Sequence, residues 1–344
     1  MKIKINKNLT ISDKKPPIVI AEISGNHAGK KSSFLNHIRL AKENGADMVK
    51  IQTYEPEDIT LNQRGKKFRM NSGTWKGKFL WDLYKKAHTP FSWHYDAFKL
   101  AKKLNITLFS SPFSKRAVDL LEEFKVPLYK VASFEITDLE LIDYIARKRK
   151  PIIISTGMAT LKEIKNAIKV IEKYHKKIII LYCVSGYPTK ISEANISTIK
   201  IFKKLFKNYL IGISDHTNDI YSALAATSLG ATVIEKHFIL NKKMKSVDRS
   251  FSIDCTDLNN LKNFSKNIHL ALGKPYIGPK KNEINSLKLR RSIFAIKDIN
   301  KGEKFSKNNI RSYRPKIGIG SEKYVEVLGK TAKRKFIKGS PIFF

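Results

Sequence analysis

The stretch Pro151–Val184, PIIISTGMATLKEIKNAIKVIEKYHKKIIILYCV, contains a complete strand–helix–strand pattern. Its two ends, Pro151–Thr156 and Lys177–Val184, are short runs of apolar and β-branched residues. Between them, Leu161–Tyr174 repeats apolar residues at the spacing of an amphipathic helix. Continuous apolar strands joined by a helix are typical of a parallel sheet covered by helices. The stretch therefore predicts one βαβ unit.

The same alternation extends over most of the chain. Further strands are expected at Ile18–Ile23, Asp47–Thr53, Ile106–Ser111, Pro127–Ser133, Tyr209–Ser214 and Ala231–Phe238. Further helices are expected at Ser32–Asn44, from Pro90 onward, and at Ser114–Phe124, Asp138–Arg149, Glu193–Lys207, Asn218–Leu229 and Asp257–Leu272. Eight such units predict an α/β fold, a (β/α)8 TIM barrel. An open doubly wound sheet is disfavoured because no glycine-rich dinucleotide fingerprint follows the first strand. The long polar connection Tyr54–Thr89 predicts a lid or substrate wall.

The character of the sequence changes after Gly273. We expect a barrel domain over residues 1–273, a Gly-, Pro- and Lys-rich linker over 274–290, and a small β-rich domain over 291–344. A weak internal echo supports the third part, because Lys301-Gly302 and Lys338-Gly339 each form a turn signal between apolar positions.

The composition is that of a globular protein with an unusual charge. Hydrophobic residues make up 42% of the 344, and 66 basic against 30 acidic residues give a net charge of +36. Such a charge raises a nucleic-acid-binding hypothesis, which we disfavour because the lysines are scattered along the chain. Two cysteines, no apolar run long enough for a membrane span and no signal-peptide pattern predict a cytoplasmic protein without a membrane partner.

The carboxyl ends of the strands are the place for chemistry in a barrel. His216 and His237 lie at the ends of the last two predicted strands, so we expect them to share one divalent metal ion. Glu235 should face the same side of its strand as His237. Glu22 and Glu135, from strands one and four, are candidates for sugar binding or for general acid–base catalysis.

Two lysines, Lys50 and Lys130, interrupt otherwise apolar strands. Buried lysines need partners, so either they pair with barrel glutamates or they form an anion site. Five serines at the strand ends favour the anion site, where they would bind a phosphate and a carboxylate: Ser110, Ser133, Ser155, Ser185 and Ser214.

These residues lie in motifs that resemble those of the sialic acid synthase family, which condenses phosphoenolpyruvate with amino-sugar aldehydes. The motifs are AEISGNH (21–27), VKIQT (49–53), FSSPF (109–113), YKVAS (129–133), ISTGM (154–158), GISDHT (212–217) and IEKHF (234–238). Residues near Arg314-Pro315 resemble the family's antifreeze-like (SAF) domain. The resemblance covers almost the whole chain.

The resemblance implies a barrel and a SAF domain in a domain-swapped homodimer. It implies Mn²⁺, Mg²⁺ or Co²⁺ on His216 and His237, where the metal would polarise the sugar aldehyde. It implies phosphoenolpyruvate contacts from Lys50, Lys130 and the five serines. Sugar contacts are implied for Glu22, Gln52, Tyr187, Asp248 and Arg314. Water activated by the metal, by Glu22 or by Glu135 would add at C2 before phosphate leaves by C–O cleavage.

Within the family, Ser24-Gly25 and Ser185-Gly186-Tyr187-Pro188 resemble the pseudaminic acid synthase branch. That branch implies 2,4-diacetamido-2,4,6-trideoxy-L-altrose as the acetamido-sugar. N-acetylneuraminate or legionaminic acid synthesis is the alternative. Ala28 departs from the usual Asn-His-Asn-Gly pattern. Another barrel aldolase and a phosphoenolpyruvate synthase for shorter sugars are further alternatives, which the basic C-terminal domain disfavours. An inactive barrel scaffold is disfavoured by the intact Lys50, Lys130, His216 and His237.

Overall fold

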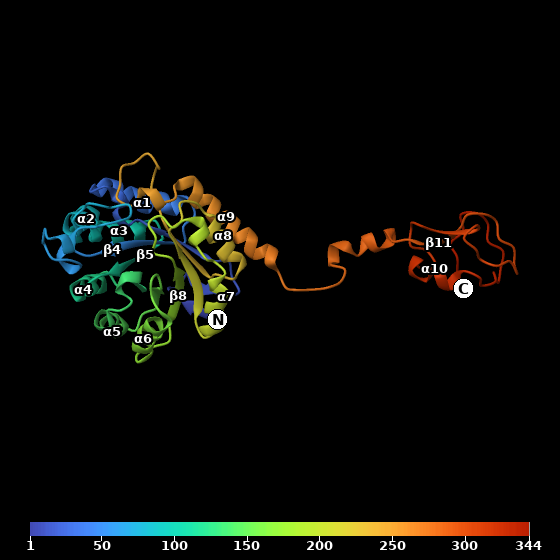
Figure 1. Cartoon of the computed structure of the whole chain (residues 1–344), viewed down its shortest axis with the longest axis horizontal. Helices are drawn as coiled ribbons and strands as arrows, with labels where there is room; N and C mark the ends of the chain where they lie inside the picture. The colour runs from blue at the N-terminus through green and yellow to red at the C-terminus, as the bar shows by residue number, and fades with distance from the viewer. Residues whose placement is uncertain (344) are drawn as a thin grey trace. The chain divides into compact units, whose positions relative to one another are not determined.

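The computed structural model describes residues 1–343, which divide into two compact units, one over Met1–Gly273 and one that begins at Lys274. In the first unit, parallel strands form a closed barrel in the order β10-β3-β4-β5-β6-β7-β8-β9 (Figure 1). Their bounds are β3 Ile18–Glu22, β4 Met48–Thr53, β5 Thr107–Pro112, β6 Tyr129–Val131, β7 Ile152–Ser155, β8 Ile178–Cys183, β9 Leu210–Asp215 and β10 Val233–His237. The predicted (β/α)8 barrel is confirmed.

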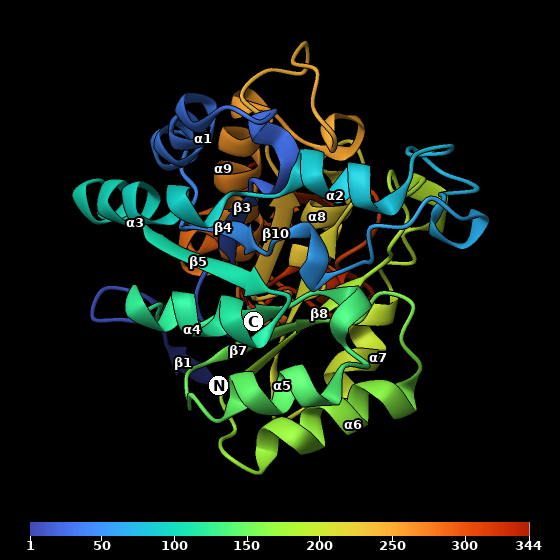
Figure 2. The ribbon, with the colours of Figure 1, turned by 90° about the vertical axis from the view of Figure 1, so that its left-hand side faces the viewer.

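Helices surround the strands (Figure 2). Their bounds are α1 Lys31–Glu43, α2 Leu80–Ala87, α3 His94–Lys103, α4 Lys115–Glu123, α5 Leu139–Ala146, α6 Leu161–Glu172, α7 Thr198–Leu205, α8 Tyr221–Ser228 and α9 Cys255–Leu272. Several begin at side-chain caps: the Thr160 hydroxyl and the Glu163 carboxylate form a capping box at the start of α6. Helix α2 was not predicted. It lies in the long second connection and has only eight residues, and its apolar face, which includes Leu80, Leu83 and Tyr84, is half-buried.

Two separate apolar layers hold the barrel together. Val49 and Ile154 face outward and pack with helix residues such as Phe34 and Ile168. The alternate positions of the strands face inward, and those nearest their amino ends form a second cluster with Ile11 of an N-terminal hairpin. The hairpin pairs β1 Lys2–Lys4 with β2 Thr10–Ser12 and was not predicted. The hairpin covers the amino-terminal end of the barrel, where the inward-facing side chains are apolar. The inward-facing polar side chains lie at the carboxyl end.

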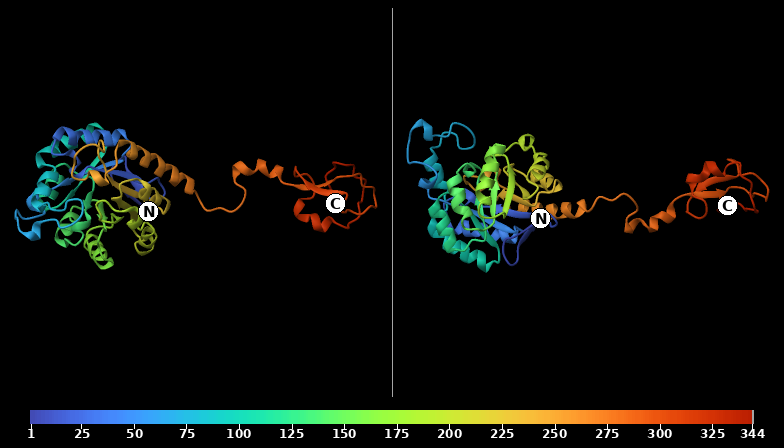
Figure 3. Two further views of the ribbon diagram at one scale, coloured as in Figure 1. Left: turned by 45° about the horizontal axis from the view of Figure 1, so that its top comes forward. Right: turned by 90° about the horizontal axis from the view of Figure 1, so that it is seen from below.

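The second unit is a small domain (Figure 3). Ile293, Phe305 and Phe336 belong to a core of its own. Strand β11 Ser292–Ala295 pairs antiparallel with β12 Ile310–Tyr313, and the short helix α10 covers Tyr324–Val327. Gly302 and Gly339 both have left-handed φ angles, of 87° and 91°, which confirms the two turns expected from the internal echo. Part of the segment 274–290 forms short 3-10 turns, at Lys281–Glu283 and Asn285–Leu289.

Candidate active site

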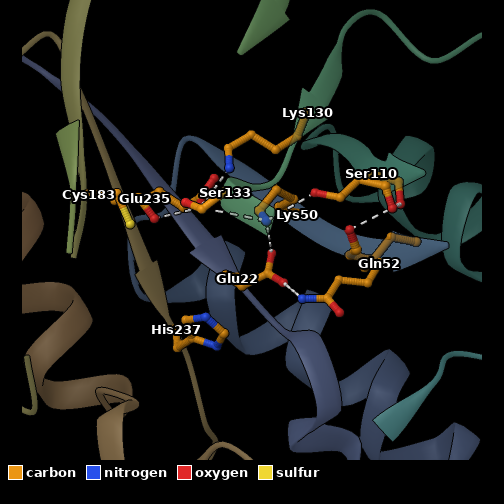
Figure 4. A network of polar contacts seen from close by, with 12 residues as sticks. Glu22, Lys50, Gln52, Ser110, Lys130, Ser133, Cys183, Glu235 and His237 are labelled. Atoms are coloured by element: carbon orange, nitrogen blue, oxygen red, sulfur yellow. Dashed lines mark hydrogen bonds and ion pairs between the residues drawn. The ribbon is translucent and has the colours of Figure 1, made fainter. Parts of the chain in front are cut away.

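A ring of charged side chains occupies the inside of the barrel at the carboxyl ends of the strands (Figure 4). The Lys50 ammonium lies 3.0 Å from Glu22 Oε2 and 3.6 Å from Glu235 Oε1. The Lys130 ammonium lies 3.5 Å from Glu235 Oε1. All four side chains are buried. The two lysines therefore have glutamate partners, and they share Glu235. The sequence predicted that Glu235 faces the site but did not predict its ion pairs with the lysines.

Burial and ion pairing shift the pKa values of the ring residues in opposite directions. Burial raises the pKa of Glu22 to about 7, although Lys50 opposes the shift. Burial also raises the pKa of Glu235, but Lys130 and Lys50 outweigh it and hold that pKa below its usual value. Burial acts to lower the pKa of both lysines. It prevails at Lys130, whereas Glu22 and Glu235 outweigh it at Lys50 and hold that pKa above its usual value. The positive charge of Lys50 suits an anionic ligand.

Hydroxyl groups surround this ring. Ser214 Oγ donates to Glu235 Oε1 at 3.0 Å, and Ser133 Oγ accepts from the Gly157 N–H at 3.2 Å. Ser155 Oγ is buried and has no hydrogen-bond partner within the described chain, so it is available to a ligand. A Cβ on Gly157 would lie 2.0 Å from Ser185 Oγ, so only glycine allows these hydroxyls to converge. The serines supply donors beside the two lysines.

Ser110 is the exception among the five serines. Its hydroxyl lies 2.6 Å from Thr53 Oγ1 and donates to the Ile51 carbonyl at 3.0 Å, in the layer between the barrel and the helices. Phe109 belongs to the inner cluster, so alternation along β5 turns Ser110 outward and Ser111 inward. Lys50 Nζ donates to Ser111 Oγ at 3.3 Å. The Ser110 side chain therefore points away from the charged ring and the Ser111 side chain points into it, which counting from Phe109 would have found.

Cys183 is a second inward-facing residue that sequence reasoning left out of the site. Its sulfur lies 3.7 Å from His216 Nδ1 and 3.8 Å from Ser185 Oγ. The thiol is buried at the end of β8. Alternation from the inner-layer residue Leu181 predicts its direction, but a lone cysteine carries no motif that would have drawn attention to it.

The two predicted metal-binding histidines come together. Their ring centroids are 5.3 Å apart, at the ends of the neighbouring strands β9 and β10. His216 Nδ1 lies 3.0 Å from the Val184 carbonyl, and donating to it leaves Nε2 as the free acceptor. His237 Nδ1 is buried, lies 3.9 Å from Asp248 Oδ2, and has no hydrogen-bond partner among residues 1–343. Burial holds the pKa of His237 well below its usual value, so its imidazole is neutral.

Within residues 1–343, no group of three or more His, Cys, Asp or Glu side chains is arranged to hold a metal ion. A metal ion on the two histidines would therefore need further ligands from water or from a substrate.

A cavity of about 330 Å³ adjoins the charged ring. Trp75, Phe134, Tyr187 and Phe251 give it an aromatic wall, and the ring centroids of Tyr187 and Trp75 are 5.5 Å apart. Its polar lining residues are Ser24, Gln52, Ser133, Glu135, His237 and Asp248. Residues from Tyr54 to Ala87 make up part of the lining, as expected of a substrate wall. Among the aromatic residues of this connection, Trp75 lines the cavity, whereas Phe68 and Phe79 are not among its described lining residues.

Some polar side chains of the cavity already have hydrogen-bond partners within the chain, and others do not. Gln52 Nε2 donates to Glu22 Oε1 at 3.0 Å, and Asp248 Oδ2 accepts from the Gly25 N–H at 3.1 Å. Glu135 Oε2 is buried without a hydrogen-bond partner in the described part of the chain. Burial raises the pKa of Glu135 to about 7. Glu135 is therefore a carboxyl able to gain or lose a proton near neutral pH.

Arg314 belongs to the second unit. There it lines a hollow of about 690 Å³ with Arg290, Arg291, Lys316 and Glu322. The four basic side chains give the hollow a positive charge that suits an anionic or hydrogen-bond-accepting group.

Comparison with known proteins identifies the family. The model of the NeuB family matches residues 37–276, and that of the SAF domain matches residues 290–344. The chain belongs to the NeuB family. The resemblance drawn from the seven barrel motifs and from the Arg314 region is thereby confirmed.

Relatives of this NeuB-family chain match along nearly its full length. It is 43% identical to the pseudaminic acid synthase of Helicobacter pylori over 94% of this chain and 96% of that protein. It is 36% identical to the N,N'-diacetyllegionaminic acid synthase of Campylobacter jejuni over 94% of this chain and 97% of that protein. The crystal structure of the N-acetylneuraminic acid synthetase of Leptospira borgpetersenii, in complex with citrate, aligns with a TM-score of 0.75 at 28% identity, covering 83% of this chain and 95% of that one.

Proposed function

We propose that this chain is a pseudaminic acid synthase, a transferase that condenses phosphoenolpyruvate with 2,4-diacetamido-2,4,6-trideoxy-L-altrose and releases phosphate. The observation that carries the proposal is the pairing of a cationic, hydroxyl-lined ring with an aromatic-walled cavity in one barrel mouth. The identity to the pseudaminic acid synthase of Helicobacter pylori supports the choice of sugar. Legionaminic or N-acetylneuraminic acid synthesis is the alternative.

Phosphoenolpyruvate is proposed to bind at the charged ring. Lys50 and Lys130 would hold its phosphate and carboxylate, with hydroxyl donors from Ser111, Ser133, Ser155, Ser185 and Ser214. The free hydroxyl of Ser155 supports this placement. A buried hydroxyl without a hydrogen-bond partner destabilises the protein, and a bound ligand that hydrogen-bonds to it removes that penalty. Lys50 and Lys130 would also keep the two anionic groups fixed while the sugar approaches.

A divalent metal, Mn²⁺, Mg²⁺ or Co²⁺, is proposed to bind His216 and His237. The neutral imidazole of His237, with its unpartnered Nδ1 among the described residues, and the free Nε2 of His216 fit such an ion. When bound, a divalent cation acts as a Lewis acid towards a carbonyl oxygen. The Val184 carbonyl accepts a hydrogen bond from His216 Nδ1, and this contact would hold the imidazole with its Nε2 turned towards the ion.

The open-chain sugar is proposed to occupy the adjoining cavity. Trp75 and Tyr187 would pack against its deoxy end, and Gln52, Asp248 and Glu22 would bind its polar groups. C3 of phosphoenolpyruvate would then bond to the aldehyde carbon, whose oxygen takes up a proton and becomes a hydroxyl. Water would add at C2 and lose one proton, and the hydroxyl left there would pass its proton to the departing phosphate as the C–O bond breaks. We assign the proton lost by that water to Glu135, because Glu22 is held by Lys50 and Gln52 whereas Glu135 Oε2 has no partner in the described chain.

We further propose a domain-swapped homodimer in which Arg314 of one copy serves the sugar site of the other. The segment 274–290 has four exposed apolar side chains, which support a partner surface there: Tyr276, Ile277, Ile284 and Leu289.

Within residues 1–343, every helix is too short or too polar to span a lipid bilayer. A cytoplasmic location is proposed from the free thiols of Cys183 and Cys255, which are typical of a reducing compartment.

The test is phosphate release from phosphoenolpyruvate with Mn²⁺. The sugars to compare are 2,4-diacetamido-2,4,6-trideoxy-L-altrose, its 6-deoxy diacetamido manno isomer and N-acetylmannosamine. Turnover confined to the altrose sugar supports the proposal. Turnover only with a manno sugar moves the chain to another branch of the family, and no turnover with any sugar contradicts the synthase assignment.

A further inference from the structure

A buried polar network lies directly behind the two histidines, on the outer face of the barrel wall. Lys236 is fully buried, and its ammonium lies 2.9 Å from Asp215 Oδ2. It also donates to Thr217 Oγ1 at 3.1 Å and to the Thr217 carbonyl. Thr217 N–H donates to Asp215 Oδ1 at 2.9 Å, and Thr217 Oγ1 donates to Asp215 Oδ2 at 3.1 Å. The three residues thus saturate one another with hydrogen bonds.

The position of this network ties it to the histidines. Lys236 and Asp215 are registered partners across the parallel strands β10 and β9. His237 follows Lys236 and His216 follows Asp215, so alternation turns both histidines inward while the ion pair faces outward. A slip of one residue would exchange the two faces. The network therefore fixes both the register of the two strands and the bend after β9 that carries His216.

We propose that the Asp215–Thr217–Lys236 network positions His216 and His237 for divalent-metal binding, without itself touching metal or substrate. The inference rests on the metal site of the proposed function. Its physical basis is that a fully buried ammonium loses most of its stabilisation if its carboxylate moves, so the pair tolerates one spacing of the strand ends. That spacing sets the separation of the two imidazoles, whose ring centroids are 5.3 Å apart.

The test measures Mn²⁺ binding by the full-length protein, for example from the electron paramagnetic resonance signal of free Mn²⁺. In Lys236→Met we expect the Kd for Mn²⁺ to rise about tenfold, because the two imidazoles would no longer be held at one separation; loss of a group that orients a ligating histidine has an effect of about this size. The Mn²⁺ concentration for half-maximal phosphate release should rise in parallel, while kcat at saturating Mn²⁺ stays within about threefold of the unmodified value.

Lys262→Met is the matched control. Lys262 on α9 lies 2.6 Å from Asp47 Oδ2, just before β4 and so at the opposite end of the barrel strands. Both variants should lower the melting temperature of the metal-free protein, but only Lys236→Met should change the Kd for Mn²⁺. An unchanged Kd in Lys236→Met overturns the inference.

Thr217→Val is the milder variant if Lys236→Met does not fold. It removes one hydroxyl of the network, and we expect the Kd for Mn²⁺ to rise about threefold, since a lost hydrogen bond of modest strength has that effect. A Kd equal to that of the unmodified protein overturns the inference. If the unmodified protein binds no Mn²⁺, the metal part of the proposed function fails and this inference with it.

Discussion

Replacing Glu135 with glutamine should stabilise the protein increasingly as the pH rises. Burial raises the pKa of Glu135 from 4.5 to about 7. The folded state therefore holds this proton more tightly than the unfolded chain. The stabilisation it provides is complete below pH 4.5 and is lost as the pH rises to about 7. Glutamine cannot ionise, so the free energy of unfolding of Glu135→Gln does not fall over this pH range through that residue.

The size of the effect follows from the two pKa values. A shift of about 2.5 pH units corresponds to about 3 kcal/mol. Glu135 lines a cavity and is not fully sealed from water, so we expect about 2 kcal/mol at pH 8. For a unit of this size that is a rise of about 4–8 °C in melting temperature, with little difference between the two proteins at pH 4.5.

Thermal unfolding of both proteins at pH 4.5 and pH 8 measures the prediction. Glu43→Gln, on the exposed side of α1, is the control and should show the same small change at both pH values. Phosphate release by Glu135→Gln should fall about a hundredfold or more, because the proton acceptor is lost. A stability difference that does not depend on pH would refute the buried-carboxyl argument, and full activity would refute the proton role.

Three further predictions concern the ring and the first strand end. Ser111→Ala should raise the KM for phosphoenolpyruvate about tenfold, whereas Ser110→Ala should leave that KM within twofold. Equal effects of the two substitutions in steady-state assays would contradict the inward direction of Ser111 and the outward direction of Ser110. Lys130→Met should lower kcat/KM for phosphoenolpyruvate by a factor of about a hundred or more, with loss of phosphoenolpyruvate binding in calorimetry as the check. Ala28→Asn should raise the free energy of unfolding by about 0.5–1 kcal/mol, because Ala28 has a left-handed φ of 52° that asparagine tolerates better than alanine does. Denaturant titration measures this change, and a lower stability of the variant would contradict the prediction.

Local sequence patterns predicted most of the barrel. Each of the eight strands is a short apolar run whose burial on both faces follows from its own composition, and the helices between them have apolar stripes of the right period. The inward direction of Lys50, Lys130 and His237 follows from alternation within a single strand. Helix α2 and the N-terminal hairpin were missed because each is short, and each gains its stability from contacts with distant parts of the chain.

By itself, the sequence determined the fold class, the family and the set of polar residues at the strand ends, since these depend on local period and on motifs of a few residues. Only the tertiary structure decided which of those residues meet. Closure of the barrel brings Glu235 between Lys50 and Lys130, brings Ser111 to Lys50, and places Cys183 beside His216. These contacts join residues far apart in sequence, and their partners depend on strand register, which is fixed when the whole sheet closes and not by any one segment.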